Sequence, residues 1–177
     1  MVIVMQQVEK SNKSDEIHSN DVEQYLTFML GGKVYGLEIL NIKEILEYGE
    51  VTDVPMTPDF ISGVINLRGS VVPVIDLSQR FSGKPTEHTK RTSIIILEVK
   101  NDDLSIEIGV TVDMVNEVLD INPNEIEPAP SLGNQIQTNF ISGMAKVDGK
   151  LLILLDIENV LSVDELSLAG SIQVAAE

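Results

Sequence analysis

Apolar and polar residues alternate along most of this chain, and turn residues interrupt the alternation at intervals. Between 24 and 39 the alternation continues on both sides of Gly31-Gly32, which is typical of a β-hairpin. The continuous β-branched run at 93–99 is typical of a strand buried on both faces, and 106–112 alternates again. Many short strands joined by turns favour an all-β fold made of small closed barrels.

One stretch of the sequence occurs twice. Residues 60–81 read FISGVINLRGSVVPVIDLSQRF, and 80 positions later residues 140–161 read FISGMAKVDGKLLILLDIENVL. At a shift of 73 positions, the repeat extends backwards to a match between 36–46 and 109–119. Such self-similarity indicates a duplicated unit. We therefore expect two similar barrels.

Each copy of the repeat contains a hairpin turn, and the two turns differ in one residue. The second copy has Asp148-Gly149 between apolar runs, and both positions of such a tight turn need a positive φ. The first copy has Arg68-Gly69 at the same place. Arginine is a poor residue for left-handed backbone, so this turn is a candidate functional position. A longer loop with a glycine bulge would accept Arg68 at no cost, and it stays open as the alternative.

Three further segments are assigned from local signals. Residues 1–20 are mostly polar with no sustained period, and they predict a disordered acidic tail. The apolar spacing in 41–48 fits either a short helical turn or a bulged strand. The capping box at Ser162 to Glu165 predicts a C-terminal helix over 162–174.

The order of these elements also predicts how the chain divides. We expect one domain over 22–166, with a first barrel over about 22–81 and a second over about 82–145. Strands from 146–157 are candidates to complete the first barrel. Two half-size barrels that pack together solve the difficulty that each would have in burying a core alone.

Composition then narrows the classes of partner. The formal net charge is −16, from 12 basic and 28 acidic residues, which opposes binding to nucleic acid and to anionic membranes. Only three Tyr and four Phe are present, too few for a stacking platform for single strands. The chain has no Cys and no apolar run long enough for a membrane span. We expect a soluble cytoplasmic protein with no direct membrane insertion.

The residues that could carry chemistry are few. His18 lies in the polar tail and His88 in a polar connector, so neither is placed to form a catalytic triad or a metal site. Asp76 and Asp156 each follow a strand and precede a short apolar turn, where a carboxylate caps free amides. The sequence thus favours recognition of another protein over catalysis, with no metal or cofactor.

The run from Phe60 to Leu77, with Asn66-Leu67-Arg68-Gly69 at its turn, closely resembles the CheW family of chemotaxis adaptors. The similarity covers about residues 24–162. The resemblance implies two interlocked five-stranded barrels of the SH3-like or OB-like kind, related by a pseudo-two-fold duplication. It also implies a protein without catalytic activity.

By the same resemblance, the partners would be the histidine kinase CheA, through its regulatory domain, and the cytoplasmic tip of chemoreceptors at the inner face of the membrane. Arg68 would lie at this contact, with Glu44 and Ile42 beside it and Gly63 keeping the backbone close. Val118 is a candidate groove residue from the second copy. An adaptor of another receptor and kinase system, such as surface motility, stays an alternative, and an OB-type nucleic-acid-binding protein is much less favoured.

Overall fold

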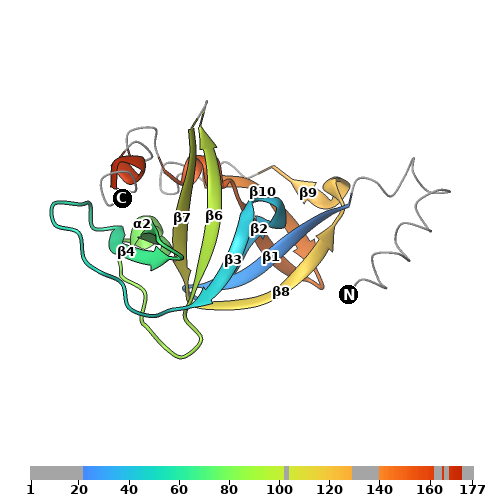
Figure 1. The fold of residues 1–177 in the computed structure, drawn as a ribbon. Coiled ribbons are helices and arrows are strands. Elements are labelled where there is room, and N and C mark those ends of the chain that lie inside the picture. The colour runs from blue at the N-terminus through green and yellow to red at the C-terminus, as the bar shows by residue number, and fades with distance from the viewer. Residues whose placement is uncertain (1–21, 102–103, 129–139, 162–164, 166–167, 173–177) are drawn as a thin grey trace.

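The computed structural model describes residues 22–101, 104–128, 140–161, 165 and 168–172. Long strands dominate the molecule, and short helices lie beside them (Figure 1). The strands are β1 (Glu23–Leu30), β2 (Lys33–Glu38), β3 (Ile42–Glu47), β4 (Ile61–Leu67), β5 (Ser70–Asp76), β6 (Ser93–Asn101), β7 (Leu104–Val112), β8 (Met114–Ile121), β9 (Ile126–Glu127), β10 (Ile141–Val147) and β11 (Lys150–Leu155). The helical segments are η1 (Ile39–Asn41), α2 (Leu77–Ser82), η2 (Pro123–Glu125) and α3 (Ile157–Val160).

The strands form two sheets. One has the order β8-β1-β2-β11-β10-β9 and the other β3-β6-β7-β5-β4. Neighbouring strands are antiparallel except at β2–β11 and β5–β7, which pair in parallel. The predicted all-β fold of two small SH3-like barrels is confirmed.

The repeat explains the two parallel pairings. In chain order, β1 to β5 of the first repeat correspond to β6, β7, β8, β10 and β11 of the second. The first two strands of each repeat join the sheet formed by the later strands of the other repeat. The two barrels are therefore interlocked, as the family resemblance implied.

This exchange corrects the predicted division of the chain into 22–81 and 82–145. Strands β3 to β5 pair with β6 and β7, whereas β1 and β2 pair with β8 and with β11. Strand β11 lies within 146–157, and it pairs with β2 in the sheet that contains β1. The reason for the error is that alternation fixes which face of a strand is buried but does not fix its partner strand.

Several local predictions can be compared with the structure. Segment 42–47 is a bulged strand rather than a helix, and a register shift falls between Ile42 and Glu44. Asp76 caps α2 by accepting a hydrogen bond from the amide of Gln79 at 3.2 Å. Asp156 accepts one from the amide of Glu158 at 3.2 Å. Both carboxylates are thus helix caps.

The two ends of the chain are only partly described. The predicted tail at 1–20 lies outside the described residues. Of the helix predicted over 162–174, positions 165 and 168–172 are helical, and the remaining positions lie outside the described residues.

The hydrophobic core consists of three clusters of buried side chains. The largest takes residues from both sheets, such as Phe28 and Leu37 from one and Ile95 and Ile108 from the other. The two smaller clusters each lie within a single sheet. The main core therefore holds the two barrels together.

Arg80 joins the two repeats, because its side chain contacts an equivalent residue of each. Its guanidinium carbon lies 5.0 Å from the ring centroid of Phe60 and 5.1 Å from that of Phe140, and these two residues are repeat equivalents. Its Nε donates a 3.1 Å hydrogen bond to the carbonyl of Val160, and Nη2 contacts Glu165 at 3.0 Å. The side chain is 21% exposed, so these interactions are largely shielded from water.

We predict that Arg80→Ala lowers the free energy of unfolding by about 2 to 3 kcal/mol, because it removes the contacts with two rings, the hydrogen bond to the carbonyl of Val160 and the ion pair with Glu165. Urea denaturation measures the loss. Arg91→Ala, on the exposed connector, should change stability by less than about 0.5 kcal/mol. Equal effects of the two changes would contradict this role of Arg80.

Candidate functional site

The turn between β4 and β5 has the tight two-residue geometry expected for its equivalent in the second repeat. Arg68 has φ 53° and Gly69 has φ 89°, while Asp148 and Gly149 have φ 54° and 77°. The side-chain oxygen of Asn66 accepts a 3.0 Å hydrogen bond from the amide of Gly69 and so supports the turn. The longer-loop alternative is thus excluded, and Arg68 occupies left-handed backbone.

Arg68 forms a two-point ion pair with Glu44 on β3. Nη1 donates to Oε2 at 3.0 Å and Nη2 donates to Oε1 at 2.9 Å. The Arg68 side chain is 77% exposed and that of Glu44 is 25% exposed. The pair joins the turn to β3, and β3 and β4 are the two edge strands of this sheet. Because both oxygens of Glu44 are occupied, the guanidinium is held in one orientation while most of its surface faces solvent.

Ile42 lies on the same edge strand as Glu44. Ile42 is half-buried and packs against the main core, so much of its side chain serves the fold. Ile45, one residue beyond Glu44, is 44% exposed. The structure thus places an exposed apolar side chain next to the Arg68–Glu44 pair in sequence, on a strand with a free edge.

Gly63 lies in a β-bulge of β4, where the register shifts between Ile61 and Gly63. Its φ is 151°, and a Cβ at this position would collide with the carbonyl oxygen of Thr52. Thr52 forms a two-way bridge with Val64, with N–O distances of 2.9 and 2.8 Å. Gly63 therefore allows the segment after β3 to pair with β4, and it acts on the site only through the backbone.

Val118 lies in the other sheet, on β8, where it pairs with Leu26 of β1. Its side chain is 49% exposed, and it occupies the place that Ile45 has in the first repeat. Val118 lies in a different sheet from the Arg68–Glu44 pair, so no strand pairing connects them. It belongs instead to an equivalent surface on the second barrel.

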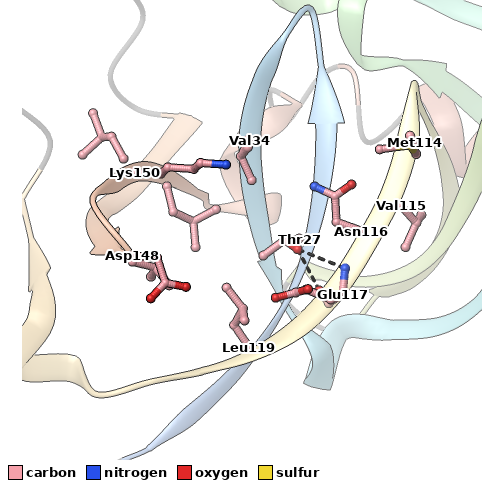
Figure 2. A pocket seen from close by; sticks show the side chains of 12 residues that line it. Thr27, Val34, Met114, Val115, Asn116, Glu117, Leu119, Asp148 and Lys150 are labelled. Atoms are coloured by element: carbon pink, nitrogen blue, oxygen red, sulfur yellow. Dashed lines mark hydrogen bonds between the residues drawn. The ribbon is translucent and has the colours of Figure 1, made fainter.

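Sequence reasoning missed the acidic character of that second surface. The repeat shifts of 73 and 80 positions place Glu117 where Glu44 stands and Asp148 where Arg68 stands. Both side chains line a groove with a volume of about 510 Å³ (Figure 2). The sequence repeat contained the signal for this acidic surface, because the second copy has two acidic residues where the first copy has one acidic and one basic residue.

Two other exposed apolar side chains were not predicted. Leu40 in η1 is 90% exposed, and Met56, in the segment between β3 and β4, is fully exposed with a φ of 64°. A left-handed conformation for a non-glycine residue costs of order 1 kcal/mol or more, and it is found at functional segments.

The described residues contain no grouping suited to metal chemistry. Among them, no three His, Cys, Asp or Glu side chains lie close enough together to hold a metal ion. His88 stacks on Tyr48 with ring centroids 4.0 Å apart, which is a packing contact. Over the same part of the chain, no helix has the length and hydrophobicity that a membrane crossing requires.

Comparison with known proteins agrees with this geometry. The family model described as a CheW-like domain matches residues 24–165. The chain is 37% identical over 150 residues to the chemotaxis protein CheW of Klebsiella aerogenes, covering 85% of this chain and 88% of that protein. It is 39% identical over 140 residues to that of Bacillus subtilis, with coverage of 78% and 86%.

A solved structure gives the same result at the level of the fold. The scaffolding protein TtCheW from Thermoanaerobacter tengcongensis matches with a TM-score of 0.73 and 37% sequence identity, over 84% of this chain and 93% of that one. Fold and comparison thus define a protein of the duplicated double-barrel class. The chain belongs to the CheW family.

We predict that Gly63→Ala lowers the free energy of unfolding by more than about 2 kcal/mol, because the added methyl group collides with backbone and must displace the bridge to Thr52. The matched control is Gly69→Ala. That glycine also has positive φ, but a methyl group added there would meet nothing within 4 Å, so only the backbone strain of about 1 kcal/mol applies. Denaturant unfolding compares them, and equal losses would show that the collision is relieved at no cost.

Proposed function

We propose that this protein is a non-catalytic adaptor of bacterial chemotaxis that couples chemoreceptors to the histidine kinase CheA. Membership of the CheW family supports the chemotaxis role, and TtCheW is itself described as a scaffolding protein. The adaptor would work in the cytoplasm, at the inner face of the membrane, where it binds the cytoplasmic tips of receptors and the regulatory domain of the kinase.

The observation that carries the proposal is the Arg68–Glu44 pair. Left-handed backbone at a non-glycine residue costs roughly 1 to 2 kcal/mol. An exposed ion pair returns only about 0.2 to 1 kcal/mol. The pair therefore does not stabilise the fold overall, and aspartate at the equivalent turn of the second repeat would suit the backbone better. We infer that Arg68 is used for what it presents to a partner.

The remaining candidate residues have distinct roles in this proposal. Glu44 orients the guanidinium fork, and Ile42 supports the strand that carries Glu44. Gly63 allows the barrel to close behind the turn. Val118 would supply an exposed apolar contact on the second barrel.

The test is receptor control of kinase activity, reconstituted with Arg68→Asp. We expect the variant to stay folded, because the second repeat already carries Asp148 together with Glu117 at the equivalent positions. Reversal of the charge at a contact desolvated on binding costs on the order of 2 kcal/mol or more, which is about thirtyfold in affinity. Receptor-dependent activation of the kinase should be lost.

The matched control is Lys33→Asp, the same change of charge at an exposed residue in the β1–β2 hairpin. It should couple receptor and kinase as the native protein does. Circular dichroism on both variants separates misfolding from loss of binding. Normal coupling by Arg68→Asp would show that Arg68 is only a tolerated turn residue.

A further inference from the structure

An open groove lies on the second barrel, between β8 and the β10–β11 hairpin. Its volume is about 510 Å³, and its walls mix apolar side chains with acidic ones. The carboxylates of Glu117 and Asp148 are directed into the space between the strand and the hairpin (Figure 2). The apolar lining includes Val34, Val115, Leu119, Val147, Leu151 and Leu152.

In the first barrel, an ion pair occupies the position equivalent to this groove. There a cation from the hairpin turn meets the carboxylate on the neighbouring edge strand, with both nitrogen–oxygen distances at or below 3.0 Å. In the second barrel the turn residue is Asp148, so the same position carries a second negative charge. Among the described residues, neither Glu117 nor Asp148 has an ion-pair partner. Lys150 also lines the groove, but no ion pair links it to either carboxylate.

We propose that this groove binds a segment of a partner protein that presents an arginine between apolar side chains. The arginine supplies from outside the cation that Arg68 supplies from within the first barrel. Its guanidinium lies against Glu117 and Asp148, and the flanking apolar side chains lie on Val115, Leu119 and Leu151.

The chemistry of the groove selects this occupant. A guanidinium offers a planar fork of donors that can serve two carboxylates at once, whereas an ammonium is a compact, strongly hydrated charge. The apolar stem of arginine suits the walls of the groove. A phosphate or an acidic segment would be repelled by the two carboxylates. A second copy of this chain is disfavoured by its net charge of −16.

The test uses two short peptides and no other protein. The probe is acetyl-Leu-Arg-Leu-amide, and the matched control replaces arginine with citrulline, which has a similar shape but no charge. Binding is followed by the amide NMR signals of 116–119 and 147–150. We expect the arginine peptide to shift these signals and the citrulline peptide to bind at least about tenfold more weakly, because citrulline cannot form a charge-assisted pair with the two carboxylates.

Variants locate the site. Glu117→Gln/Asp148→Asn should abolish the preference for the arginine peptide. Glu50→Gln/Asp53→Asn, which also removes two exposed charges but lies outside the groove, should keep it. Asp148→Arg should block the peptide by placing the cation in the same chain, as Arg68 does. Circular dichroism confirms that each variant is folded.

Four results would overturn the proposal. They are equal binding of the two peptides, shifts outside the groove, unchanged binding by the neutralised variant, or no binding of the arginine peptide. Sedimentation velocity provides a fifth: self-association that Glu117→Gln/Asp148→Asn abolishes would make a second copy the occupant. Because the kinase and the receptor are absent from this test, its outcome is independent of the proposed function.

Discussion

Exchange of strands between the two repeats is the constraint on which the rest of the fold depends. The parallel pairings β2–β11 and β5–β7 complete each sheet with strands from the other repeat, so neither repeat can close a barrel alone. The largest core cluster then fills the space between the sheets. Arg80 holds the equivalent rings of Phe60 and Phe140 together at this junction. As a result, β3 and β8 are both edge strands on a shared rigid frame.

On this frame the two barrels carry equivalent turns with opposite chemistry. The first turn places Arg68 against Glu44, whereas in the second barrel Asp148 and Glu117 both line one open groove. The backbone is nearly the same, with φ 53° and 54° at the first turn residue. Folding of the two turns therefore does not require arginine in one repeat and aspartate in the other. The two equivalent surfaces therefore differ in charge, because the first carries a neutral ion pair and the second carries two carboxylates.

Much of the fold could be predicted because it depends on local patterns and on the repeat. Alternation indicated the strands, and Asp148-Gly149 identified the turn that Arg68-Gly69 shares. Most partner strands could not be predicted, because a pairing such as that of β1 with β8 joins residues far apart in the chain and leaves no periodic signal. The ion pair of Arg68 with Glu44 could not be predicted for the same reason, because it depends on where the exchanged strands place β3. The groove at Glu117 could have been predicted by carrying the Glu44 and Arg68 positions through the repeat.

The central claim is that the Arg68–Glu44 pair is kept for what it presents to partners. Exchange of the two charges, Arg68→Glu with Glu44→Arg, tests it most directly, because the ion pair survives while the surface is reversed. We expect the free energy of unfolding to change by less than about 1 kcal/mol, the range of an exposed ion pair. We also expect receptor control of the kinase to be lost in the reconstituted system. An exchanged variant that couples as well as the native protein would contradict the account.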